Sequence, residues 1–115
     1  DKKLVFILSQ SYYEQLLEAG VRIYEYTPGF IHSKCFVCDD EIAAVGTFNL
    51  DYRSLYLHFE NGCWMYKSRA VLQVKEDTLD TMHLCGEEMT LEFCRGRNIA
   101  VRALQGVLRL FSPML

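Results

Sequence analysis

Residues 29–60 read GFIHSKCFVCDDEIAAVGTFNLDYRSLYLHFE, and this stretch decides both the expected fold and the expected chemistry. Its first half holds His32, Lys34 and Asp39 in the spacing H-x-K-x-x-x-x-D. Side chains two residues apart on an extended strand point to the same face, so the histidine and the lysine are expected to lie side by side. The pattern therefore predicts a nucleophile next to a fixed positive charge.

The second half of the stretch supplies polar groups that suit a phosphate. Gly46 lets the backbone approach closely, and Thr47 and Asn49 follow it with a hydroxyl and an amide that can donate hydrogen bonds. In attack on a phosphodiester, the imidazole serves as the nucleophile and the lysine stabilises the oxygens that gain charge. We expect Glu60 to accept a hydrogen bond from the other imidazole nitrogen and so fix the tautomer of the ring.

These residues resemble the signature of the phospholipase D superfamily, which is H-x-K-x-x-x-x-D followed by G-[ST]-x-N. Within that superfamily, the words SYYEQLLEAGVRIYEY, GTFNLDYRSLYLHFE and the closing RLFSPML resemble the C-terminal catalytic half of bacterial cardiolipin synthases. The resemblance covers almost the whole chain. One departure is His58, which stands where the family usually carries an asparagine.

The resemblance implies a two-step transfer through a phosphatidyl-histidine intermediate. His32 would take a phosphatidyl group from one phosphatidylglycerol and pass it to a second, giving cardiolipin and glycerol. Lys34 and Asn49 would hold the phosphate, Glu60 would orient the histidine, and Asp39 would have a supporting role. No metal or organic cofactor is implied.

The resemblance also implies a larger enzyme. Members of the superfamily bring two such motifs face to face, whereas this chain has one, so we expect residues 1–115 to be a C-terminal phospholipase D-like domain excised from a longer protein. Its expected partners are the N-terminal half of that enzyme, phosphatidylglycerol and the anionic membrane surface, at the cytoplasmic face of the cell membrane. The isolated domain is expected to be inactive as a monomer.

Two alternatives stay open from the sequence. One is a single-motif phosphodiesterase or endonuclease that completes its site by forming a homodimer, and the other is an incomplete half that binds lipid phosphate without catalysis. The net charge of −3 gives no broad basic surface, which disfavours a nucleic-acid substrate.

The composition is that of a folded domain. Half of the 115 residues are hydrophobic, which excludes a disordered chain and suffices for one compact domain. No apolar run approaches the roughly 20 residues that cross a bilayer. The five cysteines are expected to be reduced thiols, with Cys35 and Cys38 on opposite faces of a strand and therefore not sharing a metal.

The periodicity predicts an α/β fold, with a mixed β-sheet flanked by helices, as one phospholipase D-like half-domain. Strands are expected at residues 21–26, 31–38, 42–45 and 60–66. Helices are expected at residues 3–19, 68–85 and 97–111, with an irregular or briefly helical segment at 50–57. Residues 31–38 and 42–45 would form a hairpin with the histidine and the lysine at its mouth. For residues 3–19, a strand at 4–8 before a helix is the competing interpretation.

Two further expectations concern charge. Asp51 and Arg53 are expected to form a structural ion pair. Residues 95–115 contain four arginines and no acidic residue, so this end of the chain either touches an anionic membrane or packs its apolar stripe on the core with the arginines in water. We favour the second, with the stripe formed by Leu104, Val107, Leu108 and Phe111.

Overall fold

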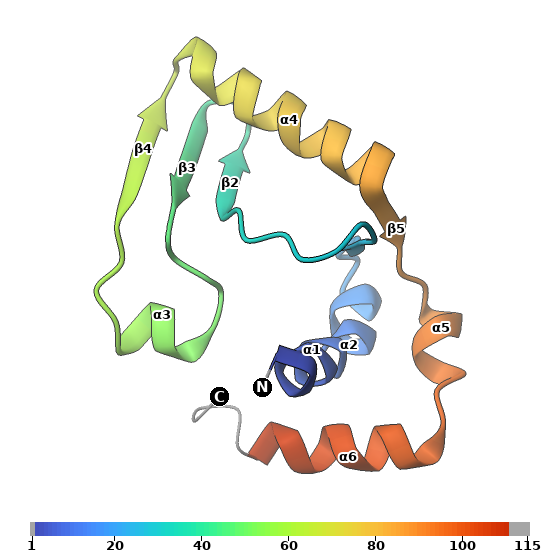
Figure 1. The fold of residues 1–115 in the computed structure, drawn as a ribbon. Helices are drawn as coiled ribbons and strands as arrows, with labels where there is room; N and C mark the ends of the chain where they lie inside the picture. The colour runs from blue at the N-terminus through green and yellow to red at the C-terminus, as the bar shows by residue number, and fades with distance from the viewer. Residues whose placement is uncertain (1, 111–115) are drawn as a thin grey trace. The chain divides into compact units, whose positions relative to one another are not determined.

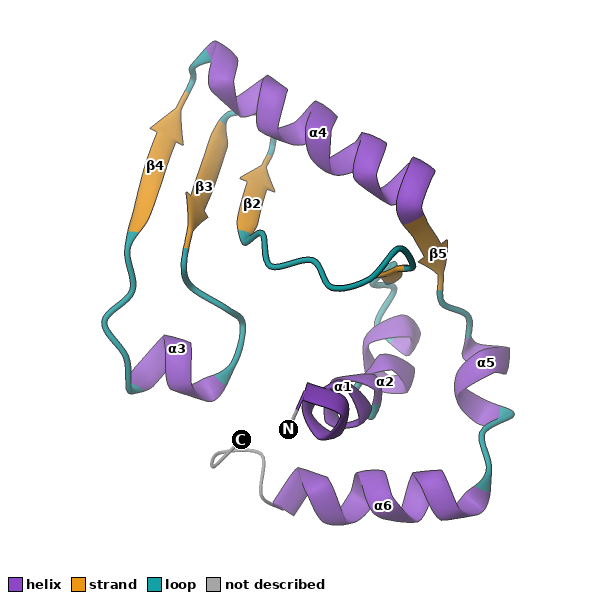
Figure 2. Cartoon of the chain, viewed as in Figure 1, coloured by secondary structure: helices purple, strands orange, loops and turns teal. Residues whose placement is uncertain are grey.

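The computed structural model of the protein describes residues 2–110 and has an α/β fold (Figures 1 and 2). The helices are α1 (Lys2–Gln10), α2 (Tyr13–Glu18), α3 (Tyr52–Tyr56), α4 (Arg69–Cys85), α5 (Leu91–Arg95) and α6 (Ile99–Leu110). The strands are β1 (Tyr24–Tyr26), β2 (Cys35–Cys38), β3 (Ile42–Gly46), β4 (Gly62–Tyr66) and β5 (Gly86–Glu88). The chain forms two compact units, one from Tyr26–Glu87 and the other from the segments before and after it.

The Tyr26–Glu87 unit is built on the three-stranded sheet β2-β3-β4. Both pairings are antiparallel, and Val37 lies opposite Ala43, which in turn lies opposite Met65. The acidic turn between β2 and β3 is tight because Asp39 and Asp40 both have positive φ, 51° and 58°. The Glu41 N–H closes this turn by donating to the Cys38 carbonyl at 3.1 Å, and Cys38 pairs with Ile42, which confirms the predicted hairpin.

Helix α4 covers one face of this sheet and contacts all three strands (Figure 1). It begins after Ser68 and buries Val71 completely, while Ala43 in the central strand is also fully buried. On the opposite face of the sheet Phe36 and Trp64 are exposed, Trp64 by 69%. The α/β class with helices flanking the sheet is therefore as predicted, and the larger sheet is antiparallel throughout.

The other unit consists of α1, α2, α5 and α6. Helix α1 packs against α6, and α2 packs against α5. Arg95 in α5 binds Glu14 and Glu18 of α2 at 3.2 and 2.8 Å. β1 and β5 form a separate two-stranded sheet where the chain passes between the units.

The packing of α6 matches the favoured expectation for its apolar stripe only in part: Leu108 of that stripe is half-buried, whereas Leu104 and Val107 are exposed. Gln105 is buried and donates to the Ile7 carbonyl, and Arg109 donates to Ser11, so the polar side of the helix faces α1. Val107 and Leu110 are exposed by 53% and 79%. The polar side packs inward because the Ile7 carbonyl in α1 and Ser11, between α1 and α2, accept hydrogen bonds there. Phe111, the last residue of the expected stripe, lies outside the described residues.

The predicted helix at residues 3–19 forms as two helices, and the alternative strand at 4–8 is wrong. The break falls at Ser11, whose carbonyl accepts a hydrogen bond from Arg109 and makes no helical bond. The predicted strand at 21–26 is reduced to β1, while β4 and α4 begin within two residues of expectation. No helix among residues 2–110 is long and apolar enough to span a membrane.

Val71→Ala is expected to lower the free energy of unfolding of the Tyr26–Glu87 unit by about 1–3 kcal/mol, because it removes fully buried methyl groups and leaves a cavity. The matched control is Leu72→Ala on the exposed side of the same helix, which is expected to change that free energy by less than about 0.5 kcal/mol. Urea unfolding followed by circular dichroism measures both. Equal losses in the two variants would contradict the burial of Val71.

Candidate active site

The two halves of the H-x-K…G-T-x-N motif meet at one end of the sheet. In the antiparallel order β2-β3-β4, β2 begins, β3 ends and β4 begins at the same end (Figure 1). Here the backbone N–H of Gly46 donates to the carbonyl of Lys34 at 3.0 Å, and Gly46 lies opposite Gly62. This end of the sheet therefore holds the segments that carry His32 and Lys34, Thr47 and Asn49, and Glu60. We call this end of the sheet the active-site edge.

His32 and Lys34 lie just before β2 and not within it, which corrects the predicted strand at 31–38. The reason is that β3 separates from β2 after Gly46, where the N–H of Thr47 donates to the Asn61 carbonyl. The residues before Lys34 therefore have no partner strand. The Nζ of Lys34 donates to the backbone carbonyl of His32 at 2.7 Å, a contact that does not involve the imidazole. The aromatic ring of Phe30 lies 5.8 Å from the imidazole.

Thr47 is held by hydrogen bonds to two residues that lie just before β4. Its hydroxyl donates to Oε2 of Glu60 at 2.5 Å and accepts from the N–H of Asn61 at 3.0 Å. The hydrogen bond from Thr47 is the main reason that the pKa of Glu60 lies below its ordinary value, and Ser54 adds to the effect. Glu60 is thus an ionised carboxylate at this edge. Among residues 2–110 it forms no hydrogen bond with His32.

Asn49 belongs to the loop that leads into α3. Asp51 caps this helix by accepting from the N–H of Ser54 at 2.7 Å, and this bond, with the amide of Asn49, holds the pKa of Asp51 below its usual range. The predicted ion pair between Asp51 and Arg53 does not form within the described chain. Arg53 instead donates to Nε2 of His58, at 2.8 Å from Nη2, because the helix ends two residues before the histidine and turns it back onto Arg53.

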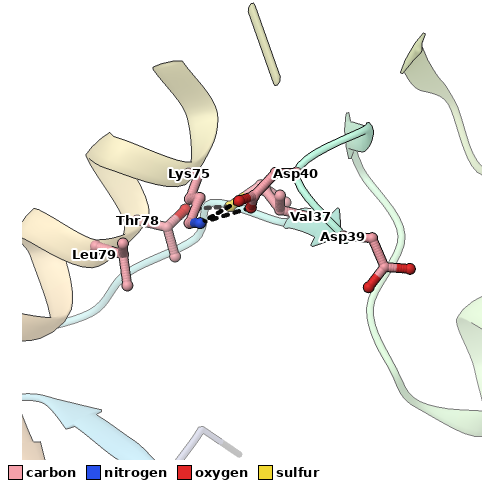
Figure 3. Close-up of a pocket in the computed structure, with 7 residues that line it drawn as sticks. Val37, Asp39, Asp40, Lys75, Thr78 and Leu79 are labelled. Atoms are coloured by element: carbon pink, nitrogen blue, oxygen red, sulfur yellow. Dashed lines mark hydrogen bonds and ion pairs between the residues drawn. The ribbon is translucent and has the colours of Figure 1, made fainter. Parts of the chain in front are cut away.

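Asp39 lies at the other end of β2, in the hairpin turn, separated from Lys34 by the whole strand. It lines a pocket of about 250 Å³ between the hairpin and α4 (Figure 3), whose walls are Cys35, Val37, Asp39, Asp40, Lys75, Thr78 and Leu79. Figure 3 shows its carboxylate pointing away from the Lys75–Asp40 ion pair. The thiol of Cys38 donates to Asp39 at 3.4 Å, and the nearby carboxylate raises the pKa of that thiol.

The structure thus places the segments that carry five of the six candidate residues at one end of the sheet, with direct contacts between Lys34 and Gly46 and between Thr47 and Glu60, and puts the sixth residue, Asp39, at the other end. It also adds residues that the sequence analysis did not single out. Asn61 binds both the hydroxyl and the N–H of Thr47, and Ser54 binds Asp51. The D-x-x-S spacing before a short helix is a capping signal that identifies Ser54, whereas no sequence pattern marks Asn61.

The chain thus has a histidine and a lysine at the mouth of an antiparallel hairpin, followed by G-T-x-N at the adjoining strand end. A family model described as "Cardiolipin synthase, PLD-like domain" matches residues 1–82. The whole chain is 43% identical to a cardiolipin synthase of Halalkalibacterium halodurans and 38% identical to cardiolipin synthase 2 of Bacillus anthracis. The chain belongs to this family of phospholipase D-like domains of cardiolipin synthases.

The chain spans 23% and 22% of the length of those two relatives. It is also 43% identical to an uncharacterized protein of Streptococcus mutans, of which it covers 25%. Comparison with solved structures gives no significant match.

Thr47→Val is expected to raise the pKa of Glu60 toward its ordinary value, because the hydroxyl that stabilises the ionised carboxylate is lost. A group with a depressed pKa in the folded state adds stability above its unfolded pKa, and this contribution disappears as the pH falls through the folded pKa. The variant should therefore lose the part of the acid-side pH dependence that Glu60 supplies. A carboxyl-carbon NMR titration of Glu60 measures the shift, with Thr78→Val in α4 as the control that leaves it unchanged.

Proposed function

We propose that this chain is the C-terminal catalytic half of a cardiolipin synthase and transfers a phosphatidyl group between two phosphatidylglycerol molecules. The observation that supports this most strongly is the hydrogen bond that joins Lys34 to Gly46, because it sets the two halves of the motif against each other. Membership of the cardiolipin synthase family and the names of the relatives support the substrate.

The first step is attack by a nitrogen of His32 on the phosphorus of one phosphatidylglycerol. A nitrogen–phosphorus bond forms, the bond from phosphorus to the glycerol oxygen breaks, and glycerol leaves after it takes a proton from a general acid. In the second step a hydroxyl of another phosphatidylglycerol attacks the phosphorus and gives up its proton to the same group. The nitrogen–phosphorus bond breaks, which releases cardiolipin and regenerates the free imidazole.

The remaining residues stabilise the charge that develops on the phosphate oxygens. Lys34 supplies the positive charge, while Thr47 and Asn49 donate hydrogen bonds from the loop after β3. Glu60 accepts a hydrogen bond from Thr47, and its carboxylate would have to turn toward the imidazole in order to orient the ring of His32. Asp39 supports the hairpin from its far end, where its charge is remote from the reacting atoms.

The general acid is the component that this chain lacks. One histidine cannot attack the phosphorus and also protonate the leaving oxygen on the opposite side. His58 is engaged by Arg53, and His83 lies near the end of α4, so neither has a lysine and asparagine beside it. We assign the acid to a second phospholipase D-like half of the same enzyme, for which the exposed Phe36 and Trp64 offer an apolar docking face.

The substrate places this chemistry at a membrane surface, and we propose the cytoplasmic face of the cell membrane. Two of the arginines in residues 95–115 form ion pairs within the chain, because Arg95 and Arg102 both pair with Glu14. An attraction of residues 95–115 to anionic lipid is therefore weaker than their four arginines suggest. The lipid contact is assigned to the active-site edge instead.

His32→Ala in the full-length protein is expected to abolish both transfer and the covalent intermediate, because the attacking nitrogen is gone. Lys34→Ala should keep the intermediate but slow its formation about 10²–10³-fold, as for one lost stabilising donor. The assay follows cardiolipin from labelled phosphatidylglycerol and the acid-labile phosphohistidine adduct. His83→Ala is the matched control, and normal turnover by His32→Ala would remove the histidine from the mechanism.

The 115-residue chain is expected to show no turnover of phosphatidylglycerol as a monomer, because it supplies one of the two groups that the reaction needs. Association of two copies would bring two His32 side chains to one site and restore weak phosphodiesterase activity. Transfer on phosphatidylglycerol and hydrolysis of DNA are assayed across protein concentration while light scattering reports the oligomeric state. Full transfer activity from a monomer would overturn the two-motif requirement, and DNA hydrolysis by a dimer would favour an endonuclease.

A further inference from the structure

Two glycines face each other where β3 and β4 meet the active-site edge. Gly46 and Gly62 are Cα partners in the antiparallel ladder. Neither has positive φ, so the backbone conformation alone does not demand glycine at these positions. The reason for both glycines must therefore be space.

That space is filled by the ring of Phe48. A Cβ placed on Gly46 or on Gly62 would overlap Cε1 of this ring, and one on Gly46 would also lie 2.8 Å from the Cα of Gly62. The outer side of the ring stacks on Phe36 of β2, with centroids 5.4 Å apart and planes inclined by 25°. The ring of Phe48 thus packs on the backbone of Gly46 and Gly62 and on the ring of Phe36, and so contacts all three strands of the sheet. We call this packing on the two glycines the seat of Phe48.

Phe48 stands between the two proposed phosphate ligands in the sequence G-T-F-N. Thr47 is fixed by its bonds to Glu60 and Asn61, whereas Asn49 is exposed and its amide hydrogen-bonds to Asp51. The ring is therefore the nearest packed group to Asn49 along the chain. Its seat on the glycine pair determines the direction in which the loop leaves β3.

We propose that Phe48 is a positioning residue that holds Thr47 and Asn49 at the phosphate site through its seat on Gly46 and Gly62. The geometric part of this proposal depends only on the contacts described above. The catalytic part rests on the proposed function, because the loop matters to turnover only if it binds the reacting phosphate. A displacement of about 1 Å in such a group can cost about 10²-fold in rate.

The geometric part is tested by amide hydrogen exchange in Phe48→Leu, which keeps an apolar side chain but not the flat ring. Exchange at the amides of Thr47 and Asn61, whose bonds close the loop, is expected to quicken by about tenfold or more, while amides in the middle of β3 and β4 stay protected. Phe59→Leu is the matched control, since Phe59 is fully exposed in the loop before β4. Equal exchange in Phe48→Leu and the parent protein overturns the proposal, as does faster exchange across the whole sheet.

The seat itself is tested by a double-mutant cycle. Gly62→Ala is expected to disturb the loop because the new Cβ overlaps the ring, and Phe48→Leu is expected to relieve part of that effect in the double variant. Exchange at the Thr47 amide is again the readout, so the cycle does not depend on activity. Strictly additive effects of the two substitutions would show that the ring does not occupy the space over Gly62, and would overturn the proposal.

The catalytic part is tested by the kinetics of the full-length Phe48→Leu protein on phosphatidylglycerol. A positioning role predicts a fall in kcat of about 10- to 100-fold with little change in the melting temperature, whereas a purely structural role lowers the melting temperature and leaves kcat per folded molecule unchanged. Unchanged kcat together with faster loop exchange overturns the catalytic part. If the parent protein has no transfer activity, the proposed function fails and the exchange experiments still decide the geometry.

Discussion

The backbone hydrogen bond from Gly46 to Lys34 is the interaction on which the site depends. It is the last hydrogen bond between the β2 and β3 segments. Beyond it the two segments diverge, one toward His32 and the other toward Thr47. Because it is made by main-chain atoms, it fixes the spacing of the two motif halves whatever the intervening side chains are. The tight turn at Asp39 and Asp40 sets the register that makes this bond possible.

The sequence predicted the parts of the fold that local chemistry controls. The hairpin was predictable because two short apolar runs flank an acidic turn, and α4 was predictable from its length and apolar periodicity. The start of β2 was not, because a strand continues only while its neighbour does, and β3 leaves at Thr47 to pair toward Asn61. Where strand pairing ends is a tertiary property that the alternation of residues 31–38 does not contain.

The same limit applies to the candidate site and to α6. The residue types identified Thr47 and Glu60 separately, but they did not predict the hydrogen bond between them. The two residues are thirteen positions apart and come together because β3 pairs with β4. For α6 the apolar stripe was visible, yet Leu108 is half-buried while Leu104 and Val107 are exposed. An amphipathic pattern shows that a helix has two sides, and acceptors such as the Ser11 carbonyl decide which side packs within this chain.

The described chain keeps few side chains from water. Its buried hydrophobic residues are Leu8, Ala43, Ala44, Val71, Met89 and Cys94, and two of these are alanines. Large apolar groups such as Trp64 and Leu110 are meanwhile exposed. Any polypeptide or lipid that covers them binds the folded form and not the unfolded one, and so shifts the folding equilibrium by mass action. Such a covering molecule would lower the population of the unfolded chain, and with it the rate at which proteases degrade the chain.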